Sequence, residues 1–200
     1  SIGRGVRTGA VVLGASVGKM ADYATVVLAS EGVTMLDLHE ARTLFEPAIV
    51  HALEGLSATV VEAAVKDLRA VVAELEAELR LKNYVGVVAG TQRFHGYLAG
   101  SSGNRTIALL VETLHMISDD VYASALLRED RSNSDAVHKN MTKTVAGYKA
   151  LVDLLDKKKF EEAAAFWKRY MERSRDFLRS TQLGKRQIVH NGAGAQAAAS

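Results

Sequence analysis

The sequence predicts an all-α protein, a single antiparallel bundle of about seven helices, and three observations support this fold class. Only one proline occurs in 200 residues, which favours long uninterrupted helices because proline breaks the helical hydrogen-bond ladder. Apolar residues recur at intervals of three and four from about residue 16 to about residue 183, which is the period of an amphipathic helix. The hydrophobic fraction of 48% and the charged fraction of 24% are ordinary for a globular protein.

Seven helical segments follow one another along this region, separated by polar or glycine-containing breaks. The first ends at Gly32, and the second follows Thr34 as its N-cap with Asp37 three residues on. Pro47 lies inside the second segment and predicts a kink or a local break there. The third opens with Thr59 and Glu62, a capping-box pattern. We expect the seven helices at about 16–31, 35–55, 59–80, 84–99, 104–127, 135–156 and 160–182.

The two ends of the chain differ in composition from this helical region. Residues 1–15 are rich in glycine and contain short β-favouring runs, so we expect at most one small hairpin there. Residues 184–200 are small and polar, which predicts a flexible tail. The predicted domain therefore spans residues 16–183.

Charge and composition exclude several classes of protein. The net charge of +2, from 25 basic and 23 acidic residues, is too balanced to predict nucleic-acid binding by this chain alone. The absence of cysteine excludes a disulfide scaffold and a thiolate metal site, and it favours the reducing cytoplasm. No stretch approaches the roughly 20 apolar residues of a membrane span, so we expect no membrane association.

Polar side chains occupy several positions that the helical period assigns to the core. Thr91 and His95 lie one turn apart on the inner face of the fourth predicted helix, and Tyr148 and Tyr170 lie on the inner faces of the sixth and seventh. A buried polar group must find a partner, which water or a ligand in a cavity would provide. Each of these residues, taken singly, is also compatible with an ordinary structural role.

The second predicted helix adds a charged pair. Arg42 and Glu46 are four residues apart and can pair along one face of that helix. One interpretation is a surface ion pair. The other is an arginine held by Glu46 and directed at an anionic ligand, since a guanidinium group matches a carboxylate.

Several short motifs follow one another along the chain, namely Asp37-Leu38-His39-Glu40-Ala41-Arg42 with Glu46, Arg93-Phe94-His95 followed by Leu98-Ala99, and Ser102-Gly103-Asn104. In the order and spacing of these motifs and in the spacing of its last two helices, the chain resembles the C-terminal effector-binding (FCD) domain of FadR-type regulators in the GntR family. The resemblance covers about residues 16–180. It further implies that residues 1–15 are the end of a winged-helix DNA-binding domain and its linker.

Many members of that family hold a divalent metal with one aspartate and three histidines. The resemblance places those four positions at Thr91, His95, Tyr148 and Tyr170, of which only His95 is a typical metal ligand. A threonine hydroxyl and two phenols are poor donors at neutral pH. We therefore expect no bound metal and no other cofactor.

The resemblance implies a ligand-sensing domain of a DNA-binding transcription regulator. The expected effector is a fatty acyl-coenzyme A, a fatty acid or another carboxylate, and the expected partners are operator DNA, through an upstream domain missing from this chain, and a second copy in a homodimer. One alternative is a dimerisation module without a ligand. A helical enzyme is disfavoured, because the sequence shows no nucleophile–base arrangement. The expected ligand-binding residues are Arg42, Glu46, Thr91, His95, Asn104, Tyr148 and Tyr170.

Overall fold

The computed structural model describes residues 16–128 and 134–189. Within these residues all the regular structure is helical, which confirms the predicted fold class, and the hairpin expected in residues 1–15 lies outside the described part. The helices are α1 (Val17–Ser30), α2 (Met35–Ala52), a short 3₁₀ turn η1 (Leu53–Gly55), α3 (Ala58–Arg80), α4 (Tyr84–Gly100), α5 (Arg105–Arg128), α6 (Ser134–Asp156) and α7 (Phe160–Arg179).

Side-chain caps fix where the helices begin. The Thr34 side chain accepts a hydrogen bond from the backbone N–H of Asp37, and the Asp37 carboxylate accepts one from the backbone of Thr34, a complete capping box. The N-cap of α3 is Ser57 rather than the expected Thr59. Helix α2 continues through Pro47, so the local break expected at this proline is absent.

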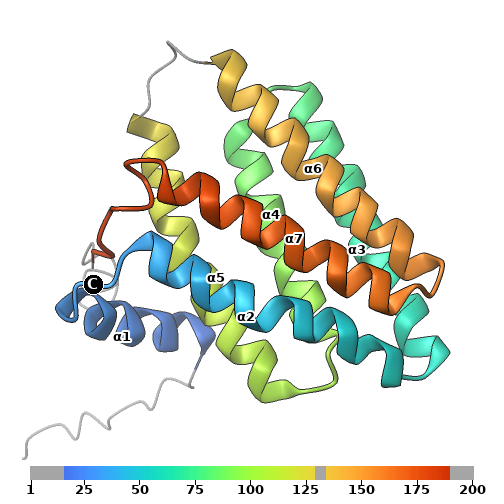
Figure 1. Ribbon diagram of the computed structural model, residues 1–200. Coiled ribbons are helices and arrows are strands. Elements are labelled where there is room, and N and C mark those ends of the chain that lie inside the picture. Colours follow the sequence, from blue (N-terminus) through green and yellow to red (C-terminus); the bar gives the residue numbers. More distant parts are fainter. Residues whose placement is uncertain (1–15, 129–133, 190–200) are drawn as a thin grey trace, which may run out of the picture.

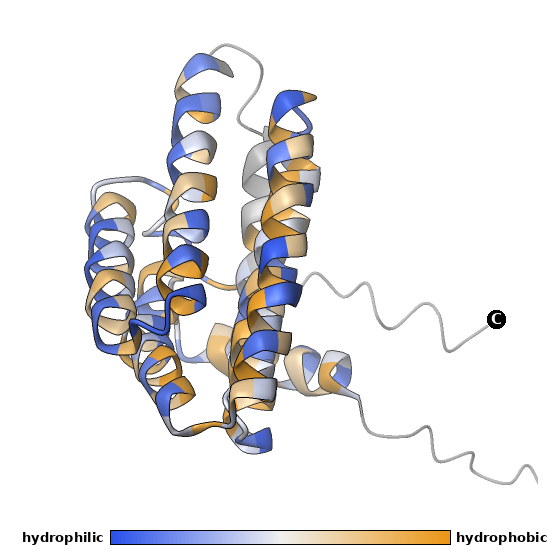
Figure 2. Ribbon diagram, turned by 90° about the vertical axis from the view of Figure 1, so that its right-hand side faces the viewer, coloured by the Kyte–Doolittle hydropathy of each residue, from blue (hydrophilic) through white to orange (hydrophobic). Residues whose placement is uncertain are grey.

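Most of the helices pack against more than one neighbouring helix (Figure 1). Helix α2 lies along α7, α3 packs against both α4 and α6, and α5 packs against α4 and α1. Helix α1 crosses the edge of the bundle, and only Ala21 of this helix is buried. In Figure 2 the long helices alternate hydrophilic and hydrophobic residues along their length, as expected of helices with one face turned inward. None of the helices in the described ranges is both long and apolar enough to span a bilayer.

Two clusters of buried apolar residues hold the bundle together. The larger lies mainly among α3, α4, α6 and α7, with contributions from α2, η1 and α5, and includes Leu68, Phe94, Leu151 and Trp167, each 0% exposed. The smaller joins α1, α5, the start of α2 and Ile188 beyond α7. Burial of apolar surface on this scale is the main driving force for such a fold.

Residues 184–189, which the sequence assigns to the tail, lie against the start of α2. The backbone N–H of Met35 donates to the carbonyl of Arg186 at 2.9 Å, and that of Ile188 donates to the carbonyl of Val33 at 2.9 Å. The side chain of Ile188 is buried in the smaller apolar cluster. This short segment therefore extends the packed unit beyond α7.

Candidate functional site

The inner face of α2 carries polar residues where an apolar stripe would be usual. His39, Arg42, Thr43 and Glu46 are all buried, and their spacing of three and four places them on one face of the helix. Glu46 is the most deeply placed of them, with 1% of its surface exposed. A buried carboxylate is rare unless it is paired and hydrogen-bonded.

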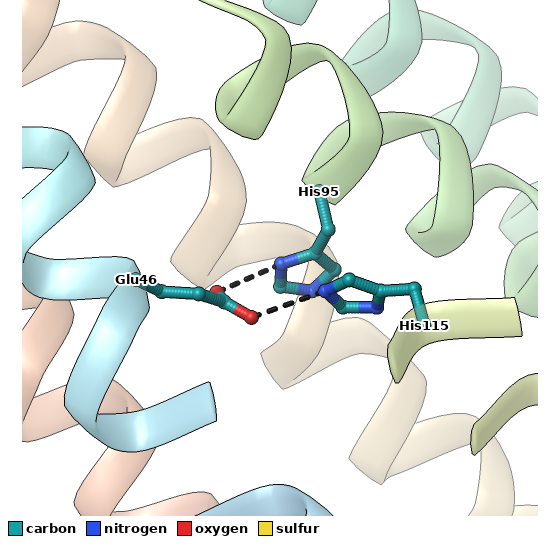
Figure 3. A group of neighbouring side chains, drawn as sticks. All are labelled: Glu46, His95 and His115. Carbon is teal, nitrogen blue, oxygen red and sulfur yellow. Dashed lines mark hydrogen bonds and ion pairs between the residues drawn. The ribbon is translucent and has the colours of Figure 1, made fainter. Parts of the chain in front are cut away.

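The Glu46 carboxylate accepts four hydrogen bonds from side chains of four helices. Its Oε1 receives Arg42 Nε at 2.9 Å and His115 Nε2 at 3.1 Å. Its Oε2 receives His95 Nδ1 at 2.9 Å and Trp167 Nε1 at 3.0 Å. Figure 3 shows the two imidazole rings, from α4 and α5, directed at the carboxylate on α2. We call these five residues together with Tyr148 the Glu46 cluster.

Glu46 is ionised, and its charge determines which nitrogen of each neighbouring histidine carries the proton. Burial by itself would raise the pKa of Glu46, but its interactions with His95 and Arg42 and the hydrogen bonds from both imidazoles hold it well below its usual value. An ionised carboxylate can only accept hydrogen bonds. The proton of His95 therefore lies on Nδ1, and that of His115 lies on Nε2.

The opposite nitrogen of His95 is consequently an acceptor. Its Nε2 lies 2.7 Å from the hydroxyl oxygen of Tyr148 and 3.1 Å from Nη2 of Arg42, and both of those groups can donate. Burial lowers the pKa of His95, and the nearby Arg42 charge adds to this effect against the opposing influence of Glu46. His95 is thus neutral, and the positive charge of Arg42 and the negative charge of Glu46 balance each other.

His115 completes the cluster from α5. Its ring stacks on the His95 ring, with centroids 4.3 Å apart and an interplanar angle of 20°. Burial, followed by the Arg42 charge, holds the pKa of His115 well below its usual value, so this ring is also neutral.

A set of aromatic rings encloses the cluster on the side of α6 and α7. Phe94 stacks on Tyr148 with centroids 4.3 Å apart, and Trp167 stacks on Tyr170 with centroids 4.7 Å apart. A Cβ atom at Gly147 would collide with the Tyr170 ring, so the glycine lets this ring approach α6 closely.

The structure brings four of the seven predicted site residues together, namely Arg42, Glu46, His95 and Tyr148. Tyr170 lies one ring further out, with its centroid 5.9 Å from that of Tyr148. Thr91 is half-buried, and its hydroxyl donates to the carbonyl of Val88 in its own helix.

Asn104, the seventh predicted site residue, is exposed and caps α5. Its side-chain oxygen accepts from the backbone N–H groups of Thr106 at 3.0 Å and Ile107 at 3.1 Å. The geometry therefore explains Asn104 as a helix cap.

Three buried polar residues were missed by the sequence reasoning. His115 follows the buried Val111 by four residues, so helical periodicity could have identified it. Trp167 lies three residues before Tyr170 on the inner face of the seventh predicted helix, where its indole N–H requires a partner. His39 was visible only as part of a motif, although it lies three residues before Arg42 on the inner face of α2.

The residues present do not fit the metal that the family resemblance implies. Thr91, Tyr148 and Tyr170 offer only hydroxyl groups, which are poor donors to a divalent ion. The lone pair of His95 Nε2 faces the Tyr148 hydroxyl and the Arg42 guanidinium, whose positive charge opposes a second cation.

A second group, Glu46, His95 and His115, has potential ligand atoms within 4.8 Å of one another. A metal ion lies in the plane of each imidazole that binds it, along the nitrogen lone pair. The His95 and His115 rings are stacked with their planes inclined by 20°, so an ion held close to the nitrogen of one ring and in its plane lies well out of the plane of the other ring. Hydrogen bonds to the carboxylate account for this geometry without a metal.

Two hollows in the described surface lie apart from the Glu46 cluster. The larger, about 610 Å³, is an open apolar groove between α1 and the α2–α5 pair. The smaller, about 100 Å³, lies between α3 and α6. The larger is lined by Met20, Tyr23, Ala24, Val27, Leu28, Phe45, Leu110, Thr113 and Leu114.

Comparison with known proteins identifies one family. The model of the FCD domain family matches residues 37–173, more than half of the chain, and this range contains every residue of the Glu46 cluster. No curated protein and no solved structure matches the chain significantly.

Proposed function

Because this chain belongs to the FCD domain family, the C-terminal effector domain of GntR- and FadR-type regulators, we propose that a small organic effector binds within the bundle at the Glu46 cluster. FCD domains are regulatory rather than catalytic. A regulator of this kind binds an effector and DNA.

The observation that carries the proposal is the convergence of five helices on one buried cluster. Helix α2 supplies Arg42 and Glu46, and α4, α5, α6 and α7 each supply one further side chain through hydrogen bonds of 2.7–3.1 Å. A ligand that rearranges this cluster would therefore alter the relative positions of several helices. Such a ligand shifts the equilibrium only if its affinity for the two arrangements differs.

The surroundings of the cluster favour an effector with an apolar body and a small polar end. The enclosing groups are aromatic rings, and the ionised groups Arg42 and Glu46 neutralise each other. A fatty acyl-coenzyme A, a fatty acid or another carboxylate fits this description. We further propose that binding requires no metal, since the donor set is unsuitable for one.

The wider setting follows from the family. We propose that the chain acts as a homodimer in the cytoplasm and that an upstream winged-helix domain contacts the operator. Sedimentation of the purified protein tests the dimer directly.

Thermal denaturation with candidate effectors tests the central proposal. Acyl-coenzyme A thioesters, fatty acids and small carboxylates are each added at up to millimolar concentration, and at least one class is expected to raise the melting temperature. His95→Ala, which removes one hydrogen-bond partner from each of Glu46 and Tyr148, should abolish the response. If no class of ligand raises the melting temperature, the proposal fails.

One observation favours a second candidate, a dimerisation module without a ligand. The rings of Tyr148, Trp167 and Tyr170 pack against one another beside His95, and the polar atoms of the cluster bond to one another. A stable dimer that responds to no effector, and that co-purifies with no small molecule by mass spectrometry, would support this candidate.

A further inference from the structure

His39 is a deeply buried histidine that the Glu46 cluster does not include. Only 4% of its surface is exposed. It lies on α2 three residues before Arg42, and its Nε2 contacts the backbone carbonyl of Met171 on α7 at 3.2 Å. His39 therefore lies at the contact between the two helices that pack most extensively in the bundle.

The other ring nitrogen of His39 has no hydrogen-bond partner among the described residues. A carbonyl oxygen can only accept, so the proton of His39 lies on Nε2 and Nδ1 carries a lone pair. A buried acceptor without a donor is destabilising, and most such groups in native proteins are satisfied by protein, water or ligand.

His138 Nδ1 is the other buried nitrogen without a partner in the described ranges, and its setting differs. His138 is only half-buried and lies near the start of α6, with its ring 6.1 Å from that of Tyr84. Solvent lies close to such a position. His39, in contrast, is enclosed between α2 and α7.

The neighbouring groups do not supply the missing donor. The Thr43 hydroxyl donates to the carbonyl of His39 itself at 2.9 Å. The N–H groups that converge nearby from α4, α5 and α7 are directed at the Glu46 carboxylate. His39 Nδ1, on the inner face of α2, therefore still lacks a hydrogen-bond donor within the described part of the chain. A carboxylate placed at this nitrogen would not supply one, and it would be repelled by the charge of Glu46.

We propose that His39 Nδ1 accepts a hydrogen bond from a hydroxyl or amide N–H group of the effector. This inference rests on the proposed function and narrows it, because it selects hydroxylated acids and amide-bearing thioesters over simple fatty acids. A donor that arrives here binds beside the His39–Met171 contact, and it can thus act on the packing of α2 against α7.

The electrostatic setting of His39 is consistent with an acceptor role. Burial lowers the pKa of His39 from 6.5 to about 4, and the nearby Arg42 charge adds to this effect. Glu46 and the Met171 carbonyl oppose the shift, while His95 contributes weakly to it. The ring is therefore neutral near pH 7 and keeps its lone pair on Nδ1.

The test uses two probes that differ by one donor, octanoate and 3-hydroxyoctanoate. Their dissociation constants are measured by calorimetry for the wild-type chain, for His39→Phe and for His51→Phe, a matched control at an exposed histidine of the same helix. The hydroxylated probe is expected to bind the wild type and the control about tenfold more tightly than octanoate. In His39→Phe this preference should disappear.

A second measurement uses only the wild-type protein, so it does not depend on whether the His39 variant folds. In ¹⁵N nuclear magnetic resonance of the wild type, the Nδ1 signal of His39 should have the shift of an unprotonated nitrogen. It should move on addition of 3-hydroxyoctanoate and not of octanoate.

The possible failures are distinguishable. Equal affinity for the two probes, with an unchanged Nδ1 signal, overturns the role of His39 and leaves the proposed effector site intact. Absence of binding by both probes, together with no response to the acyl-coenzyme A thioesters, overturns the proposed function and this inference with it.

Discussion

Oε2 of Glu46 on α2 and Nδ1 of His95 on α4 lie 2.9 Å apart in the buried centre of the bundle. This contact places the His95 proton on Nδ1 and leaves Nε2 to accept from Tyr148 and Arg42. A carboxylate that orients a histidine in this way is common behind metal-binding imidazoles. Here the opposite nitrogen faces the Tyr148 phenol and the Arg42 guanidinium, so the positive charge next to His95 is that of an arginine side chain and not that of a metal ion.

Removal of the Glu46 charge should destabilise the fold strongly. Glu46→Gln removes the negative charge that pairs with the buried Arg42 and turns an amide N–H toward at least one of the four donors. Loss of one partner of a buried ion pair costs about 3–5 kcal/mol. Urea denaturation followed by circular dichroism would measure the change in the free energy of unfolding.

A surface ion pair provides the control for Glu46→Gln. Glu74 pairs with Arg93 at 2.6 Å, and both side chains are about half exposed. Glu74→Gln should cost less than about 1 kcal/mol. If the two variants lose similar stability, the central role assigned to Glu46 is wrong.

Stability should fall as the solution is acidified below pH 6.5. The unfolded chain protonates His39 near its ordinary pKa of 6.5, whereas the folded chain does so only near pH 4. Between these values each pH unit costs about 1.4 kcal/mol, or about 3 kcal/mol in all. Burial lowers the pKa values of His95 and His115 as well, so they act in the same direction.

The lowered pKa of Glu46 extends this loss to lower pH. Its contribution to stability is complete above its ordinary pKa of 4.5 and disappears as the folded carboxylate protonates well below that value. Urea denaturation at pH 7.5, 6.5, 5.5 and 4.5 tests the range of the histidines, and further measurements at pH 3.5 and 2.5 test that of Glu46. His39→Gln should make the loss less steep between pH 6.5 and 4, because His95 and His115 still contribute to it, and His51→Gln serves as the matched exposed control. A stability that is constant from pH 7.5 to 5 would contradict the neutral state of the buried histidines.

Helical periodicity was sufficient to predict most of the fold. The one-proline composition and the apolar spacing predicted all seven helices, and the Thr34–Asp37 capping box appears as expected. Pro47 did not break α2, because a proline removes one backbone hydrogen bond while the packing of the helix on both sides of it is retained.

The cluster was harder to predict, because convergence is a property of tertiary packing. Periodicity assigned His95 and Tyr148 to inner faces, but it could not show that both would meet Arg42 and Glu46. Arg42 and Glu46 were equally compatible with a surface ion pair. His115 satisfies the same period, but residues on its helix such as Val111 and Ile117 are apolar, and this pattern is typical of an ordinary core helix.

Chelation should leave the protein unchanged, because the donor atoms around His95 do not suit a metal. We expect the same melting temperature with and without EDTA, and no increase on addition of Ni²⁺ or Zn²⁺. The triple variant Thr91→Asp, Tyr148→His and Tyr170→His supplies imidazole and carboxylate donors at the positions implied by the family and should gain metal affinity. Loss of helicity on EDTA treatment of the wild type would contradict this prediction.

The contact between Gly147 and Tyr170 offers a test of the aromatic packing. A Cβ atom at Gly147 would collide with the Tyr170 ring, which stacks on Trp167 with centroids 4.7 Å apart. Gly147→Ala gains about 1 kcal/mol in helix propensity but must displace this ring, and overpacking of a core costs about 1–3 kcal/mol. We expect a net loss of stability and, because Trp167 is the only tryptophan in the sequence, a change in the fluorescence of the protein.

Gly96 in α4 is the matched control, because no atom lies within 4 Å of a Cβ built there. Gly96→Ala should therefore stabilise the protein by about 0.5–1 kcal/mol and leave the tryptophan emission unchanged. If the free energy of unfolding falls in Gly147→Ala and rises in Gly96→Ala, the loss at Gly147 comes from the collision with the Tyr170 ring and not from helix propensity. If both variants stabilise the protein, Tyr170 can leave its stack at little cost, and the space beside Tyr148 is then available to a ligand.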